Sequence, residues 1–208
     1  MTSVFVTFEG IDYSGKSLQS RLLCERLQSD HRAVLLLRDP GATRISEKIR
    51  RLLLDKALDE MAAVTELLLY EAARSQMVAQ LIEPALASGR TVICDRFYDS
   101  TTAYQGFARG LDLDLVQAAN RIGSCGLVPG HTFLLDLDPA AALARKKISG
   151  RKADRIEQEG LMFQNRVREG YLQTAAREPD RFTVLDAQVA PEVLHQTIWS
   201  VFVQKFDE

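Results

Sequence analysis

Residues 4–17 read VFVTFEGIDYSGKS, and this stretch decides the fold. Gly10 to Ser17 fit the pattern G-x-x-x-x-G-K-[ST], in which backbone N–H groups surround a phosphate. The β-branched and aromatic run before it predicts a buried strand. Several leucines after it share one face of a predicted helix: Leu18, Leu22, Leu23 and Leu27. Because the pattern works between a strand and a helix, this context favours a phosphate-binding loop over a chance glycine turn.

Length and composition place the chain among globular proteins. Its 208 residues suit a single domain, 1–208, with 46% hydrophobic and 26% charged residues. The net charge of −2 gives no sign of a nucleic-acid partner or a membrane surface, and no apolar run reaches the length of a membrane span. Cys24, Cys94 and Cys125 form no C-x-x-C pair, and each lies in an apolar setting. We expect buried, reduced thiols and a cytoplasmic protein.

Strand-like and helical runs alternate along the whole chain. The predicted strands cover 3–8, 33–38, 91–95, 132–138 and 182–187. The predicted helices cover 15–29, 44–54, 60–88, 112–124, 139–147, 156–177 and 191–205. This alternation predicts an α/β fold, a doubly wound parallel five-stranded sheet with helices on both faces. Ligands bind such sheets at the carboxyl ends of the strands.

Charged residues collect at those strand ends. Asp95 closes the third predicted strand, where a carboxylate can hold Mg²⁺ through water, and Arg96 beside it can clamp a phosphate. An exposed ion pair of little energetic value is the simpler alternative for these two residues. Asp138 also follows a strand, but the Asp-Pro pair better fits the start of a helix. No Asn-Lys-x-Asp stretch is present that would read guanine.

A basic cluster follows the fourth predicted strand, between Arg145 and Arg155. A solvated helix end is the usual explanation for such a run. The phosphate loop itself contains no arginine, however, and a phosphoryl-transfer enzyme needs cations that close over the reacting groups. The cluster is therefore a candidate for a mobile lid near 145–156.

The segment DRFYDSTTAYQGFARGL, residues 95–111, carries the most specific resemblance. It resembles the D-R-[YF]-x-D-S-x-x-A-Y-Q-G segment of the thymidylate kinase (dTMP kinase) family. The stretches FVTFEGIDYSGKS, RDPGATRISEKIRRLLL and GRKADRIEQEGLMFQNRVREGYL are also similar to that family, so the resemblance runs nearly end to end. It implies transfer of a phosphoryl group from ATP to dTMP, giving dTDP for dTTP synthesis, and a homodimer.

The resemblance also implies roles on the donor side. Lys16, Ser17 and the loop amides would hold ATP and Mg²⁺, with Asp95 as the second metal-binding residue. Arg145 would stack on adenine. The implied donor-binding residues are Gly10, Ile11, Asp12, Tyr13, Ser14, Gly15, Lys16, Ser17 and Arg145. The implied catalytic residues are Lys16, Arg96, Asp12 and two lid arginines, Arg151 and Arg155.

On the acceptor side the resemblance implies that Arg96 and Arg50 bind the dTMP phosphate and that Asp12 faces the sugar 3′-hydroxyl. Tyr70 would stack on thymine, and Tyr104 would crowd the 2′ position of a ribonucleotide. Arg74, Thr101 and Gln105 would lie at the polar edge of the base. The full implied set is Asp12, Asp39, Arg50, Tyr70, Arg74, Arg96, Ser100, Thr101, Tyr104 and Gln105.

Without the family resemblance, ordinary structural roles also explain these residues. Tyr70 and Arg74 are four apart and share a helix face, where an aromatic side chain is more often core and an arginine more often solvated. Tyr104 and Gln105 would lie in a loop-to-helix segment, where capping and packing are the ordinary roles.

Four positions depart from the family pattern. Tyr13 stands where Gly, Ala or Arg is common, Leu18 where Thr is usual, and Asp39 where Glu is common. Ala42 replaces the second Gly of P-G-G-T, at a cost of about 1 kcal/mol if its φ is positive.

These departures leave three alternatives open. The chain could be another pyrimidine nucleoside monophosphate kinase, accepting dUMP, UMP or CMP. It could be a non-catalytic nucleotide-binding switch. It could also be an inactive paralogue.

Overall fold

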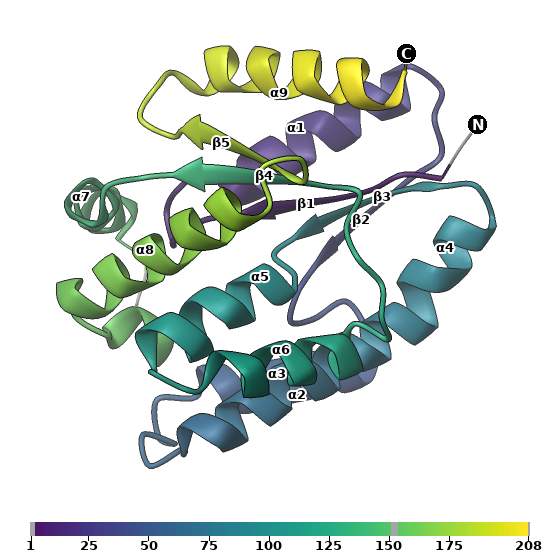
Figure 1. Ribbon diagram of the computed structural model, residues 1–208. Coiled ribbons are helices and arrows are strands. Elements are labelled where there is room, and N and C mark those ends of the chain that lie inside the picture. Colours follow the sequence, from purple (N-terminus) through teal and green to yellow (C-terminus); the bar gives the residue numbers. More distant parts are fainter. Residues whose placement is uncertain (1–2, 151–153, 208) are drawn as a thin grey trace.

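Five parallel strands form one sheet in the computed structural model, which describes residues 3–150 and 154–207. They are β1 (Phe5–Glu9), β2 (Val34–Arg38), β3 (Thr91–Asp95), β4 (His131–Asp136) and β5 (Phe182–Asp186). Their order is β2-β3-β1-β4-β5, with every neighbouring pair parallel. Together with the helices on both faces, this confirms the predicted doubly wound α/β fold (Figure 1).

Helices cover both faces of the sheet (Figure 1). On one face lie α1 (Lys16–Ser29) and α9 (Pro191–Phe206), which pack against each other. On the other lie α5 (Tyr98–Thr101) and α8 (Leu161–Arg177). Farther from the sheet, α2 (Arg44–Leu54), α3 (Ala63–Met77) and α6 (Leu113–Gly123) lie side by side, with α2 and α6 both packed on α3. The central strands β1 and β3 are buried along their whole length, as strands covered on both faces must be.

The register of the sheet brings the candidate residues to one edge. Asp95 pairs with Arg38 of β2 on one side and with Phe8 of β1 on the other. The loops that follow these three strands therefore leave the sheet together. The short helix α7 (Pro139–Ser149), which follows β4, lies at the same edge (Figure 1).

Two predicted helices were wrong as single α-helices. The segment 60–88 comprises α3, a π-helical turn η1 (Val78–Ile82) and α4 (Glu83–Ala87). Pro84 has no N–H to donate within this helix, so the α-helical hydrogen-bond ladder cannot continue unchanged through it. The segment 156–177 comprises a 3₁₀ turn η3 (Ile156–Gln158) and then α8, which begins after an extended Gly160.

Other boundaries differ by a few residues. The predicted strand 132–138 ends at Asp136, because Asp138 caps α7 and accepts the N–H groups of Ala140, at 2.8 Å, and Ala141. This confirms Asp138 as a helix start. Residues 102–108, expected in a loop-to-helix segment, form a second π-helical segment η2 (Thr102–Ala108) directly after α5.

Cys24 and Cys94 are buried as predicted, whereas the prediction for Cys125 was wrong, because this residue is exposed in the turn after α6. Within residues 3–150 and 154–207, no helix combines the length and the apolar character needed to cross a membrane. The single domain with a lid near 145–156 stays a prediction.

Candidate active site

A cavity of about 370 Å³ opens at the carboxyl ends of β1, β2 and β3. We call it the main cavity. Most of the predicted site residues line it, although they come from distant parts of the chain. The lining residues are Asp12, Tyr13, Gly15, Lys16, Ser17, Leu18, Arg38, Asp39, Pro40, Arg50, Leu54, Tyr70, Arg74, Asp95, Arg96, Ser100, Thr101, Tyr104, Gln105, Asp154, Ile156 and Glu157.

The loop between β1 and α1 forms one wall of the main cavity. A Cβ at Gly10, whose φ is +137°, would collide with the backbone carbonyl of Leu135, so only glycine fits there. Gly15, at φ +99°, lies at the N-terminus of α1, where N–H groups without helical partners favour an anion. The loop therefore has the backbone geometry that its sequence pattern predicts.

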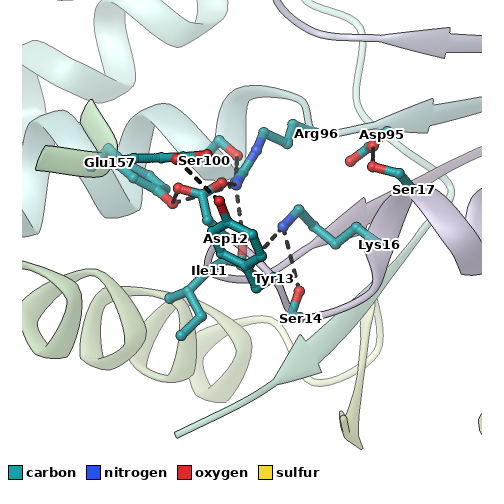
Figure 2. A network of polar contacts seen from close by, with 12 residues as sticks. Ile11, Asp12, Tyr13, Ser14, Lys16, Ser17, Asp95, Arg96, Ser100 and Glu157 are labelled. Atoms are coloured by element: carbon teal, nitrogen blue, oxygen red, sulfur yellow. Dashed lines mark hydrogen bonds and ion pairs between the residues drawn. The ribbon is translucent and has the colours of Figure 1, made fainter. Parts of the chain in front are cut away.

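Lys16 projects from the first turn of α1 into this loop (Figure 2). Its Nζ donates to the carbonyl oxygen of Ile11 at 2.7 Å and to the Ser14 hydroxyl at 3.4 Å. Burial and the nearby charge of Arg96 lower the pKa of Lys16 to about 8. A phosphate in the loop would favour the charged form of this amine.

Ser17 and Asp95 lie together at the other end of the loop, where the Ser17 hydroxyl donates to the Asp95 carboxylate (Figure 2). A hydroxyl and a carboxylate beside a phosphate loop are the oxygen donors that hold Mg²⁺ in phosphate-loop enzymes, so the residues present fit this ion. The described part of the chain contains no cluster of three or more His, Cys, Asp or Glu side chains that could bind a metal. Most ligands of a magnesium ion here would have to be phosphate oxygens and water.

Arg96 and Asp12 form an ion pair in the lining of the main cavity, with Nη2 and Oδ1 2.6 Å apart (Figure 2). Arg96 also donates to the Gly10 carbonyl oxygen and to the hydroxyls of Ser100 and Tyr171. Although burial favours the neutral acid, the charges of Arg96 and Lys16 hold the pKa of Asp12 below its usual value. The guanidinium is thus fixed at the cavity wall in a position suited to a phosphate.

Glu9 was missed by the sequence analysis. This last residue of β1 is fully buried and accepts from the Phe97 N–H at 2.7 Å, the Ser100 hydroxyl at 2.7 Å and the Tyr171 hydroxyl at 2.9 Å. Burial and the nearby Asp99 raise the pKa of Glu9 to about 7. A carboxylate that closes an apolar strand directly before the phosphate loop was the available signal.

Arg74 lines the main cavity and is held in place by three polar contacts. It is 1% exposed, and it donates to Asp39 at 2.6 Å, to Glu71 at 2.5 Å and to the Thr101 hydroxyl at 2.7 Å. The predicted contact of Arg74 with a base stays a prediction, since its guanidinium here positions Thr101 and Asp39. Asp39, which is shorter than the Glu common in the family, still forms an ion pair with Arg74 and lines the cavity.

Tyr70 and Tyr104 also line the main cavity. Tyr70 is half-buried on α3, and burial raises its pKa, which keeps the phenol neutral. The Tyr104 hydroxyl lies 3.4 Å from Arg96 and 3.5 Å from Asp12. Arg50 also lines the cavity and donates to the Pro40 carbonyl oxygen at 3.0 Å. Their predicted contacts with an acceptor remain predictions.

The predicted lid residues have mixed placements. Arg145 donates to the backbone carbonyls of Tyr13, at 3.1 Å, and Ala187, at 2.7 Å. Arg155 is 8% exposed and donates to Glu66 at 2.5 Å, outside the cavity lining. Arg151 lies outside the described residues. Stacking of Arg145 on adenine and catalysis by Arg151 and Arg155 stay predictions.

Tyr13 joins the phosphate loop to the segment after α7. It has a φ of +65°, and its hydroxyl donates to the Glu157 carboxylate at 3.2 Å (Figure 2). The side chain therefore extends away from the loop backbone toward η3. Ala42, another position that departs from the family pattern, has a φ of +69°, which meets the condition for backbone strain there.

Comparisons with known proteins give one consistent result. A family model described as thymidylate kinase matches residues 8–198. The thymidylate kinase of Pelotomaculum thermopropionicum is 47% identical over 195 residues, which cover 94% of this chain and 90% of that protein. That of Desulforudis audaxviator is 48% identical over 202 residues, covering 96% and 90%. The crystal structure of thymidylate kinase from Ehrlichia chaffeensis is similar with a TM-score of 0.79 and 34% identity, covering 97% of this chain and 99% of that one.

Proposed function

The chain belongs to the thymidylate kinase family, and we propose that its main cavity is where a phosphoryl group passes from ATP to dTMP. One observation carries this assignment to the cavity. Two cations, the buried Lys16 of the phosphate loop and the partly buried Arg96 after β3, line the same cavity, and each donates to a backbone carbonyl oxygen of that loop. Such a pair can hold the phosphates of two nucleotides against each other. Family membership does not favour the other acceptors, the switch or the inactive paralogue.

The ATP phosphates would lie on the loop of residues 10–17. Its backbone N–H groups and the N-terminus of α1 would bind the β-phosphate, and Lys16 would bridge toward the γ-phosphate. Ser17 and Asp95 would hold Mg²⁺, which supplies charge neutralisation on the phosphate oxygens. Arg145, next to the loop carbonyl of Tyr13, would support the adenine end.

The dTMP phosphate would bind Arg96 and Arg50, and its arrival would replace part of the contact between Arg96 and Asp12. Asp12 would then be released toward the sugar 3′-hydroxyl, with Tyr104 beside the 2′ carbon. Tyr70 would stack on the base, and Thr101 and Gln105 would face its polar edge. Asp39 and Ser100 would fix these groups through Arg74 and Arg96.

The chemistry needs no general base, because the acceptor is a phosphate monoester that carries nucleophilic oxygens at neutral pH. The residues of this chain would align the two phosphates in line and neutralise the charge that develops during transfer. Lys16 and Arg96 would do so from the walls. The segment 145–156, with Arg151 and Arg155, would exclude water from the reacting phosphates.

We further propose a homodimer that works in the cytoplasm. Exposed apolar side chains occur on each of three helices that lie side by side, α2, α3 and α6 (Figure 1), and a second copy of the chain can cover them. They are Ile45, Leu52, Val64, Leu68, Leu115 and Ile122. The three free cysteines agree with a reducing compartment.

Two substitutions test the assignment of the two substrate sites. Lys16→Ala should lower kcat by at least about a hundredfold, because it removes a positive charge that neutralises the transferred phosphoryl group. The far-ultraviolet circular dichroism spectrum of this variant should match that of the wild type. Gln105→Ala should weaken dTMP binding and spare ATP binding. Near-normal turnover of Lys16→Ala would contradict the donor site. Loss of ATP affinity without loss of dTMP affinity in Gln105→Ala would contradict the acceptor site.

A further inference from the structure

Glu66 is a buried carboxylate that the phosphoryl-transfer scheme leaves unused. It lies on α3, is 1% exposed and stands outside the lining of the main cavity. Its Oε1 accepts from Nε2 of Gln105 at 2.7 Å and from Nε of Arg109 at 3.2 Å. Its Oε2 accepts from Arg155 at 2.5 Å and from Arg109 at 3.3 Å. The carboxylate therefore sits directly behind a side chain that lines the cavity.

Two guanidinium groups keep Glu66 ionised. Burial alone would favour the neutral acid, but hydrogen bonds from Arg109, Gln105 and Arg155, together with the charge of Arg109, hold the pKa of Glu66 below its ordinary value. An ionised carboxylate has no hydrogen to donate and can only accept. Any polar group that touches Glu66 must therefore present a donor to it.

This requirement fixes the orientation of the Gln105 amide. A glutamine amide carries an NH₂ donor at one corner and a carbonyl acceptor at the other, and the two can exchange places by rotation. Facing Glu66, only the NH₂ corner gives a favourable contact. The Gln105 carbonyl oxygen, Oε1, then has no hydrogen-bond partner among the described residues, and Gln105 lines the main cavity.

We propose that Glu66 is a positioning residue for base selection, and that it locks Gln105 with its carbonyl oxygen toward the acceptor base. This inference rests on the proposed acceptor site. Thymine carries a hydrogen on N3, which a carbonyl oxygen accepts. Cytosine carries a lone pair on N3, which a carbonyl oxygen opposes. A locked Gln105 therefore favours dTMP over dCMP, whereas a freely rotating amide would serve both bases.

A second group at the same end of the cavity is oriented in a matching way. The Thr101 hydroxyl accepts a hydrogen bond from Arg74 at 2.7 Å, which leaves its own hydrogen to donate. A donor beside an acceptor complements the O4 and N3–H edge of thymine. Cytosine presents the opposite pattern, an exocyclic NH₂ beside a bare N3.

The test compares kcat/KM for dTMP and dCMP, with ATP saturating, in wild type and in Glu66→Gln. The substitution keeps the size of the side chain but offers both a donor and an acceptor, so the Gln105 amide can rotate and exchange its NH₂ and carbonyl positions. We expect the ratio of dCMP to dTMP activity to rise by about tenfold or more, which corresponds to about 1.4 kcal/mol. The same substitution in a Gln105→Ala background should leave the ratio unchanged, because the amide that it releases is absent.

Arg109→Lys is the matched control. It loosens the same buried cluster but keeps a positive charge beside Glu66 and leaves the contact between Glu66 and Gln105 in place, so the ratio should stay within about twofold of wild type. If Glu66→Gln does not fold, Glu66→Asp keeps the charge and withdraws it from Gln105, and a smaller rise is expected.

Distinct outcomes separate the two levels of the account. Equal loss of both activities in Glu66→Gln or Glu66→Asp, or an equal rise of the ratio in Arg109→Lys, would overturn the positioning role. A wild-type protein that does not phosphorylate dTMP would instead overturn the proposed function.

Discussion

The charge of single residues in this site depends on what surrounds them. Lys16 and Glu9 lie in the same buried region, and burial disfavours the charged form of each side chain. It therefore lowers the pKa of the Lys16 amine and raises the pKa of the Glu9 carboxyl. Both shifts act on groups close to the phosphate loop. They lead to two predictions that differ in sign and in readout.

ATP binding should be coupled to proton uptake near pH 8.5. The pKa of Lys16 is about 8 without ligand, so much of this amine is neutral at pH 8.5. A bound phosphate raises that pKa, so the complex should take up on the order of half a proton. Calorimetric titration in two buffers of different ionisation enthalpy measures this uptake. It should vanish in Lys16→Arg, whose side chain is charged throughout, and its absence in the wild type would contradict the assignment of Lys16.

Glu9→Gln should gain stability relative to wild type as the pH rises. The pKa of Glu9 is about 7 in the folded protein and 4.5, the ordinary value, in the unfolded chain, so the folded state binds this proton more tightly. The stabilisation is complete below pH 4.5 and is lost as the pH rises through 7. Glutamine stays neutral and escapes that loss.

Urea unfolding from pH 4.5 to pH 8.5 measures this effect. The difference in unfolding free energy between Glu9→Gln and wild type should change by about 3 kcal/mol in favour of the variant. Glu60→Gln, at an exposed turn, is the control and should show little change. A difference for Glu9→Gln that does not vary with pH would show that the carboxyl does not titrate as described.

At the scale of elements, the turn that leads into α2 is strained. Ala42 has a φ of +69°, immediately before Thr43, whose side chain caps α2 by accepting the Ser46 N–H at 3.0 Å. Ala42→Gly should therefore raise the unfolding free energy by about 1 kcal/mol. Ala72→Gly, at an exposed position within α3, should lower it by a similar amount. Denaturant unfolding of both variants checks the two signs, and a loss of stability in Ala42→Gly would show that this turn is not strained.

Elements that are marked by a local pattern of apolar residues or by a motif were predictable from the sequence. The five strands, the phosphate loop and the helix start at Asp138 follow from local periodicity and spacing. The π-helical segments η1 and η2 were not predictable in this way. They depend on where a proline or a tertiary contact interrupts the hydrogen-bond ladder, and the apolar pattern of a π-turn differs little from that of an α-helix.

At the scale of the whole molecule, the candidate site was predictable where a motif names the residue and unpredictable where folding alone selects it. Lys16, Asp95 and Arg96 stand in motifs, and they line the cavity. Glu9 meets Tyr171 across 162 positions of sequence, and Glu66 meets Arg155 across 89. Such partners are fixed by the packing of α3 and α8, which no local pattern encodes.

The exposed apolar side chains on α2, α3 and α6 lead to a prediction about assembly. The wild-type protein should elute with twice the chain mass of 23.3 kDa in size-exclusion chromatography with light scattering. Ile122→Glu, a change to a 76% exposed side chain on α6, should shift it to the monomer by placing a charge in the interface. Ile148→Glu, at an 87% exposed position on α7, is the control and should remain dimeric. A wild-type monomer would contradict the dimer.

The central claim is that one cavity joins the phosphates of ATP and dTMP, and release of ADP from ATP and Mg²⁺ tests it most directly. The wild-type protein would be supplied with dTMP, dUMP, UMP, dCMP, CMP, AMP or GMP in turn. We predict rapid turnover with dTMP, weaker turnover with dUMP and little with the other five. Absence of turnover with every acceptor, in a folded protein that still binds ATP, would contradict the claim.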